Sequence, residues 1–340
     1  MALPALNYSR SMGPLPAAKL SSIDRVGIAL LILWVAWVIA SAISHGSSFT
    51  DALPYLTAPA FAVLGWAAGY RLQTRGIPEW FAAFLLTLAI YVLVSMTVQG
   101  GAGGGPLGYA NANAALGIQL TAVATITALN VNGQARSWSL WAAALFALSV
   151  PWTLSQAGVA LLVGVIPAFT LAIARPHKRR LWAVPLSMLA VGAAGLTIFY
   201  IARMSDWPSA FLRAFSGARQ QLWSDAISLW AHHPITGGGP GAFAAYSRIA
   251  DDSDTERVHM SLLQVGSELG MIGLALFGAL ILTVYVKLAL SESATRLVAT
   301  AALTALLIHS FVDHLFEFPA ITLAMGMVVG LASYSRLGAK

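Results

Sequence analysis

Long apolar blocks separated by short polar segments set the pattern of this chain. Each block runs for about 18–22 residues, and an α-helix of that length crosses the ~30 Å hydrocarbon core of a bilayer. The pattern therefore predicts an all-α, polytopic membrane protein. The ten expected spans are 25–44, 52–70, 79–98, 111–130, 137–152, 155–174, 181–202, 259–286, 296–313 and 317–335.

The fifth and sixth spans share one apolar stretch. Residues 137–174 contain no charged residue, and as a single helix they would measure about 57 Å, too long for one crossing. Pro151 offers a turn, because proline cannot continue a helix without losing a hydrogen bond. We therefore expect two helices here.

Positive charge predicts the orientation of the spans. With both termini inside, the cytoplasmic segments carry fourteen of the nineteen lysines and arginines, and the outer segment 203–258 carries the other five. This arrangement satisfies the positive-inside rule. The five outer residues are Arg203, Arg213, Arg219, Arg248 and Arg257.

The expected organisation has four parts. A cytoplasmic tail (1–24) precedes seven spans (25–202), a large periplasmic or extracellular loop (203–258), and three further spans with a short tail (259–340). The tripeptide at 40–42 resembles a signal-peptidase site, but the apolar run before it is long for a signal peptide. We expect the first span to be retained as an anchor.

Composition supports a membrane protein and excludes several classes of function. The chain is 58% hydrophobic and only 9% charged, whereas soluble domains carry about 25% charged residues. The absence of cysteine excludes disulfides and thiol chemistry. The net charge of +6 resides in short segments between spans, which indicates membrane topology rather than nucleic-acid binding.

The outer loop predicts two short helices joined by a glycine-rich turn. From Ala218 onward, apolar residues recur at helical spacing beside tryptophans and arginine, which favours an amphipathic helix in the membrane interface. Pro234 ends this helix, the glycines of 237–241 permit tight turns, and a second short helix covers 243–246. The apolar stripe consists of Leu222, Ala226 and Leu229.

A capping signature precedes the eighth span. Ser253 is followed three residues later by Glu256, which is typical of a helix start. The signature predicts that the helix begins near Ser253 and that His259 lies on its second turn. The positive end of a helix favours a neutral imidazole, which can accept a proton at the membrane surface.

Four stretches carry motifs that recur together in one superfamily. They are "GYANANAALG" at 108–117, "RQQLWSDAISLWAHHPITGGGPGAF" at 219–243, "VHMSLLQVGSELGMIGL" at 258–274 and "HSFVDHLFEFPAITLAMGMVVGLA" at 309–332. In this order they resemble motifs of the O-antigen ligase and O-antigen polymerase superfamily of membrane glycosyltransferases. Two residues depart from the pattern: Gln156 stands where the family often has an arginine near the donor phosphates, and Met260 stands where asparagine is usual.

The resemblance implies a glycosyltransferase of a bacterial cytoplasmic membrane with its active site facing the periplasm or exterior. It would transfer a glycan from a polyprenyl-diphosphate carrier to a hydroxyl of a glycan, lipid or protein acceptor. No metal, nucleotide sugar or other cofactor is expected, and membrane lipid rather than nucleic acid surrounds the site. Ligase, polymerase and protein-glycosylating roles share this donor and differ in the acceptor, so the sequence does not separate them.

The resemblance also implies roles for individual residues. His259 is the expected general base, and Arg219 is the expected diphosphate ligand, since a guanidinium binds phosphate oxygens bidentately. Arg213 or Arg257 would assist Arg219. The other expected substrate-binding residues are Trp223, His233, Gly239, Gly241, Gln156 and Glu268.

Structural roles compete with several of these assignments. Arg219 would pair with Asp225 or Asp251 in the structural alternative. Asp313 and Glu317 flank an outer loop and either hold its structure or bind an acceptor or a cation. Capping or turn-forming roles are the alternatives for Asn111, Asn113 and His233.

Two other functions stay open. The first is a transporter of a small solute such as inorganic carbon, which would show broken helices and ionisable groups near the midplane. Glu268 is the ionisable residue that best fits this description. The second is a non-catalytic envelope scaffold, which the departures at Gln156 and Met260 favour. Donor binding without turnover would indicate the scaffold, and no donor binding would indicate the transporter.

Overall fold

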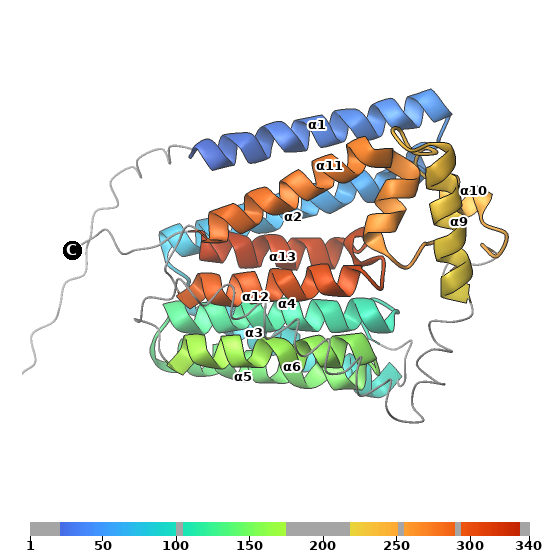
Figure 1. Ribbon diagram of the computed structural model, residues 1–340. Coiled ribbons are helices and arrows are strands. Elements are labelled where there is room, and N and C mark those ends of the chain that lie inside the picture. Colours follow the sequence, from blue (N-terminus) through green and yellow to red (C-terminus); the bar gives the residue numbers. More distant parts are fainter. Residues whose placement is uncertain (1–20, 100–104, 175–217, 251–254, 290–293, 334–340) are drawn as a thin grey trace, which may run out of the picture.

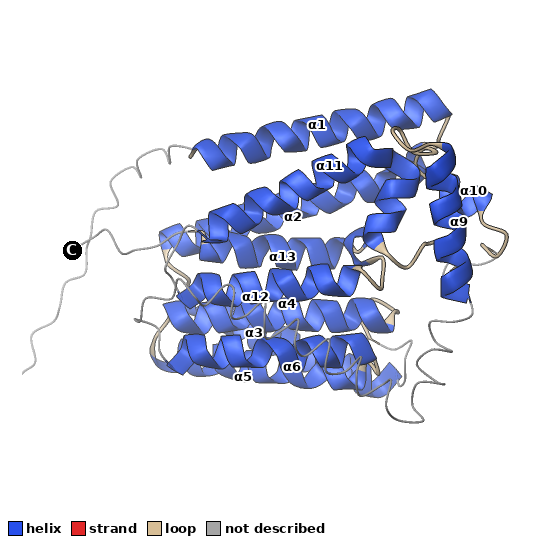
Figure 2. Ribbon diagram, viewed as in Figure 1, coloured by secondary structure: helices blue, strands red, loops and turns tan. Residues whose placement is uncertain are grey.

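Helices form all the regular structure of the described residues, as Figure 2 shows. The computed structural model describes residues 21–99, 105–174, 218–250, 255–289 and 294–333 (Figure 1). The predicted all-α class is therefore confirmed for these residues. The helices are α1 (Ser22–His45), α2 (Phe49–Arg75), α3 (Glu79–Gln99), α4 (Ala110–Asn130), α5 (Gly133–Trp152), α6 (Gln156–Ala174), α9 (Ala218–His232), α10 (Ala242–Tyr246), α11 (Ser261–Ala289), α12 (Ala294–Ser310), the 3₁₀ helix η1 (Leu315–Glu317) and α13 (Pro319–Ala332).

Within the described ranges, six helices are long and apolar enough to cross a membrane, namely α1, α2, α3, α4, α6 and α11. Helices α12 and α13 are apolar but shorter. The apolar stretch 137–174 is divided as expected, because α5 ends at Trp152 and α6 begins at Gln156. The predicted span 181–202 lies outside the described residues. The total of ten spans and their inside–outside orientation stay predictions.

Glycines allow α2 and α13 to pack backbone against backbone. Each helix carries a Gly-x-x-x-Gly repeat, at 65–69 in α2 and at 326–330 in α13. A Cβ added at Gly65 would lie 2.0 Å from the carbonyl oxygen of Leu323. Small residues at this spacing are the usual device for close helix packing in membranes.

Helix α11 is interrupted near its N-terminal end. Gly270 has φ 67° and ψ −168°, so the helical hydrogen bonds that would cross it are not made. The break releases the carbonyl groups of residues 267–269 and the N–H groups that follow Gly270. In an apolar surrounding each of these groups needs another partner.

The outer loop supplies those partners through residues 234–239, which we call the glycine stretch. Trp37 of α1 satisfies a further carbonyl, because its Nε1 donates to Leu269 O at 3.0 Å. The glycine stretch is therefore inserted into the break of α11. Its contacts run from Gly238 N to Ser267 O (2.9 Å), from Gly239 N to Glu268 O (2.9 Å), from Met271 N to Pro234 O (3.0 Å) and from Ile272 N to Ile235 O (3.4 Å).

The predicted elements of the outer loop are confirmed. Helix α9 ends at His232, just before Pro234, and α10 covers Ala242–Tyr246. In Figure 1, α9 runs across the ends of the bundle helices rather than parallel to them. Its apolar stripe is buried against Phe243 and Val258, which attaches the loop to the bundle.

The predicted start of α11 is wrong. The helix begins at Ser261, and His259 precedes it with a left-handed φ of 53°. Other contacts determine where the helix begins. The backbone N–H of Val258 donates to the Gln264 side chain at 2.7 Å, and the backbone N–H of Ser261 donates to Asp313 O at 3.1 Å.

Replacing Gly270 by alanine should destabilise the protein by about 2–4 kcal/mol, because φ is positive and the new Cβ would lie 2.2 Å from Ile235 O. The thermal unfolding midpoint of the purified protein in detergent measures the effect. Gly278→Ala is the matched control in the same helix, where a Cβ meets nothing within 4 Å. Equal midpoints for the two variants would contradict the insertion of the glycine stretch.

Candidate functional site

Asp313, in the loop between α12 and η1, is the centre of a polar cluster at one end of the bundle. Its carboxylate is fully buried. The Tyr109 hydroxyl donates to Oδ2 at 2.7 Å, and Asn111 Nδ2 donates to the same oxygen. The backbone N–H of His314 donates to Oδ1 at 2.8 Å. Neutral donors thus hold the buried charge on both carboxylate oxygens.

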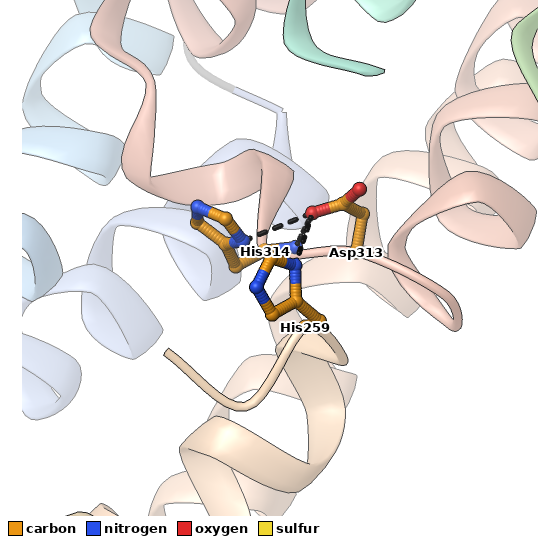
Figure 3. A group of neighbouring side chains, drawn as sticks. All are labelled: His259, Asp313 and His314. Atoms are coloured by element: carbon orange, nitrogen blue, oxygen red, sulfur yellow. Dashed lines mark hydrogen bonds and ion pairs between the residues drawn. The ribbon is translucent and has the colours of Figure 1, made fainter. Parts of the chain in front are cut away.

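Two histidine rings face the same carboxylate oxygen, as Figure 3 shows. His259 Nδ1 lies 3.4 Å and His314 Nδ1 lies 2.9 Å from Oδ1 of Asp313. The two rings meet edge to face, with centroids 4.8 Å apart. His259 is 3% exposed, and its left-handed backbone costs roughly 1–2 kcal/mol in a residue with a Cβ. Surrounding contacts therefore hold this conformation.

Burial and charge act in opposite directions on this cluster. Burial raises the pKa of the Asp313 carboxyl, but its bonds to His259 and His314 outweigh burial and hold that pKa well below its usual range. Burial lowers the pKa of His314, but the bond to Asp313 and the charge of Glu317 raise it above its ordinary value. Burial and Asp313 both raise the pKa of Tyr109. Asp313 is therefore ionised at neutral pH, and Tyr109 stays a donor.

Arg219, on the first turn of α9, brings a positive charge to the cluster. Its Nη2 lies 3.7 Å from Oδ2 of Asp313, and its Nη1 donates to Val312 O at 3.2 Å. The side chain is 23% exposed, so it remains accessible at the surface of the protein. Among the described residues its acidic partner is Asp313 rather than Asp225, and Asp251 lies outside them.

Arg257 forms a second ion pair beside the first. Its Nε lies 2.7 Å from Oε2 of Glu317, and the Arg257 side chain is 29% exposed. Burial lowers the pKa of this guanidinium, but the charges of Glu317 and Glu268, with smaller effects of Tyr55 and Glu256, together raise it above its ordinary value. Arg257 precedes His259 by two residues, and Glu317 follows His314 by three, so the pair borders the Asp313 cluster.

Glu268 of α11 organises a second buried cluster. Its carboxylate accepts hydrogen bonds from the Tyr55 hydroxyl (2.6 Å), from Gly241 N (3.0 Å) and from Phe243 N (3.3 Å). Gln264 Nε2 donates to Oε1 at 2.8 Å. These contacts hold the start of α10 against α11. A role of Glu268 or Gly241 in binding substrate stays a prediction.

The other predicted residues lie around these two clusters. Gly239 packs on His45 at the end of α1, and the exposed His233 ring meets His45 edge-on at 6.3 Å. Trp223 lies one turn after Arg219 in α9 and packs on the apolar stripe. Arg213 lies outside the described residues.

The position that lacks the expected arginine is connected to the Asp313 cluster. Gln156 is exposed at the first position of α6. The hydroxyl of the buried Ser155 before it donates to Oδ1 of Asn111 at 2.5 Å. Because Asn111 also donates to Asp313, the start of α6 is held to the cluster through Asn111.

His259, Asp313 and His314 are also a candidate metal site. Each offers one ligand atom, and these atoms lie within 4.8 Å of one another. The oxygen atoms of Asp313, however, are already shared with donors such as Tyr109, and the charge of Arg219 opposes a second cation there. Metal-free chemistry therefore stays our prediction.

Tyr109 and His314 were not among the site residues predicted from the sequence, and Asp313 was predicted only as a loop residue with two alternative roles. Both missed residues lie inside stretches with family motifs, 108–117 and 309–332. That placement was the signal that pointed to them.

Residues 141–278 match the family described as O-antigen ligase, and this segment includes Arg219, His259 and Glu268. The match confirms the predicted resemblance to the O-antigen ligase and polymerase superfamily. With the long apolar helices, it supports a multi-pass membrane protein with a glycan-transfer function in polysaccharide assembly. No curated protein matches the chain.

Replacing Asp313 by asparagine should cost about 3 kcal/mol at neutral pH, because buried donors and cations lose their anion. The pKa of Asp313 is depressed, so its stabilisation is present above the unfolded value and is lost as pH falls through the folded one. The pKa of His314 is raised, so its stabilisation is present below about pH 6.5 and is lost as pH rises through its folded value.

The gap between the thermal midpoints of wild type and Asp313→Asn should therefore be widest at mildly acidic pH. It should narrow in strong acid and again at alkaline pH. Asp225→Asn, at a partly exposed carboxyl of α9, is the matched control. A gap that does not vary with pH would contradict the ionic character of the cluster.

Proposed function

We propose that this protein transfers a glycan from a polyprenyl-diphosphate carrier to an acceptor hydroxyl on the outer face of a bacterial cytoplasmic membrane. The observation that carries the proposal is the meeting of His259, Asp313 and Arg219 in one cluster. A general base beside an accessible guanidinium suits the displacement of a diphosphate by a hydroxyl.

His259 acts as the general base. Asp313 at Nδ1 favours the tautomer in which Nε2 carries the lone pair. Nε2 takes the proton of the acceptor hydroxyl while the hydroxyl oxygen bonds to the anomeric carbon of the donor glycan. The bond from that carbon to the phosphate oxygen breaks, and the polyprenyl diphosphate leaves with the bonding electrons. Asp313 stabilises the imidazolium that forms.

Arg219 binds the diphosphate and stabilises the negative charge that develops as it leaves. A guanidinium suits this role because it stays charged and binds two phosphate oxygens at once. Arg257 lies near enough to supply a second charge, which compensates for the arginine absent at Gln156. The reaction needs no metal in this scheme.

An apolar groove between α1, α2, α11 and α13 suits the prenyl chain of the donor. Gln264 and Glu317 line one end of the groove, beside the Asp313 cluster, and Asp24 and Lys287 form an ion pair at the other. A hydrocarbon chain gains free energy by burial against such a lining. The apolar side chains between the two ends include Leu31, Pro54, Val63, Phe277 and Leu280.

The break in α11 is the feature that favours a transporter, because transporters often bind solutes at interrupted helices. Here, however, the released backbone groups bond to the glycine stretch and to Trp37, so they do not face a solute. The Glu268 carboxylate likewise accepts its hydrogen bonds from groups of the protein and not from a solute. Glycan transfer is therefore the better-supported function.

The base and the guanidinium are tested by His259→Ala and Arg219→Ala. Purified protein, polyprenyl-diphosphate oligosaccharide and a chelator are mixed, and the release of polyprenyl diphosphate is measured. We expect kcat to fall about 10²–10⁴-fold without the base and about 10²–10³-fold without the guanidinium.

His232→Ala and Arg248→Ala are the matched controls, since both residues are exposed on the same outer loop. Activity in the two site variants equal to that of these controls would refute the assignment. Donor binding without release by wild type would indicate a scaffold. Release that stops on adding chelator would indicate a metal.

Gly27→Phe tests the groove, because Gly27 lines it and an added Cβ would lie 3.6 Å from Thr283. A phenyl ring there should raise KM about tenfold for donors with long prenyl chains, since a few methylenes lose their burial. Donors with one or two isoprene units should be unaffected. Ile32→Phe, at a 63% exposed position of the same helix, is the control. Equal effects on donors with short and with long prenyl chains would mean that the prenyl chain binds outside this groove.

A further inference from the structure

Gln264 connects the two buried clusters from the first turn of α11. Its side chain is 2% exposed. Oε1 accepts a hydrogen bond from Val258 N at 2.7 Å, and Nε2 donates to Oε1 of Glu268 at 2.8 Å. These partners fix which way the amide faces, because a backbone N–H needs an acceptor and a carboxylate needs a donor.

One end of this connection holds the backbone of His259. That residue has a left-handed φ of 53° and so depends on its neighbours. Before it, the side chain of Val258 is buried and its N–H is bound by Gln264. After it, Ser261 donates from both N and Oγ to Asp313 O, at 3.1 and 2.9 Å. The direction of the imidazole follows from these fixed neighbours.

The other end holds the turn that follows the glycine stretch. Gln264 and Glu268 are one helical turn apart, so their side chains lie on the same face of α11. Glu268 there accepts from the N–H groups of Gly241 and Phe243. Two parts of the outer loop, more than a dozen residues apart in sequence, are thereby held in register on one helix face.

We propose that Gln264 is a positioning residue, which fixes the backbone of His259 relative to Glu268 and the turn at Gly241, so that the imidazole keeps its direction toward the acceptor hydroxyl. The inference rests on the proposed function of His259. Gln264 also lines the end of the apolar groove, but both ends of its amide are bound to Val258 and Glu268, so it acts on His259 through other residues. Its loss should therefore lower kcat and leave donor KM nearly unchanged.

Gln264→Leu removes both hydrogen bonds at similar bulk and should lower kcat about 10- to 100-fold. Gln264→Glu also loses activity, because a carboxylate then faces Glu268 without a donor between them. Adding Glu268→Gln to it exchanges amide and carboxylate and restores both bonds of residue 264, while the bond from Phe243 N is lost, so the recovery is partial. The double variant should recover about tenfold in kcat over Gln264→Glu alone. A double variant no better than the single ones, or a rise in KM at unchanged kcat, would overturn the proposal.

A second measurement does not depend on glycan transfer. Diethyl pyrocarbonate modifies accessible imidazoles, and peptide mass spectrometry follows each histidine. In Gln264→Leu we expect His259 to react about threefold faster or more, because its segment opens locally, while the exposed His232 reacts as before. An unchanged His259 rate overturns the positioning role. A changed rate in a protein that transfers no glycan supports positioning and refutes the proposed function alone.

Discussion

A helix that breaks inside a bundle must find partners for the backbone groups it releases, since each unsatisfied group costs several kcal/mol in an apolar surrounding. Gly270 creates such a break, and the glycine stretch meets the requirement. The requirement also explains the composition of the stretch. A Cβ at Gly237 would lie 2.3 Å from the carbonyl oxygen of Glu268, so the loop can enter the break only where side chains are absent. The described part of the outer loop is therefore fixed to α11 through residues 234–243.

This docking determines where the proposed catalytic residues lie. With the loop fixed on α11, segment 257–261 lies against the loop that carries Asp313, and the start of α9 brings Arg219 to the same place. Asp313 can be buried as an anion because donors from three separate segments converge on it, which offsets the cost of removing a charge from water. Gln264 then joins this cluster to Glu268. The backbone groups released by the break in α11 and the backbone of His259, the proposed base, are thus parts of one hydrogen-bonded arrangement.

Local signals predicted the elements, and distant contacts decided the site. The end of α9 was predictable because Pro234 is soon followed by a run of glycines, whereas Pro54 and Pro59, which no glycine run follows, lie inside α2. The split of 137–174 followed from span length together with Pro151. The start of α11 was not predictable, because the Ser253 signature is local whereas Ser261 donates to Asp313, which is 52 residues away. The hydrogen bond between Tyr109 and Asp313 could not be predicted either, since about two hundred residues separate them. No periodicity of the sequence relates a tyrosine before one helix to an aspartate after another.

The two ion pairs of the site differ in how easily each can release its arginine to a diphosphate. Asp313 retains donors from Tyr109, Asn111 and the His314 backbone when Arg219 leaves, so the buried carboxylate is not left bare. Glu317 has only Arg257 as an ionic partner among the described residues, at the shorter distance of 2.7 Å. Separating that pair would leave a partly buried carboxylate unpaired, which is costly. The arrangement therefore favours Arg219 as the residue that would leave its ion pair to bind the proposed diphosphate donor. Arg257 would stay paired with Glu317 and act on the diphosphate only through its electric field.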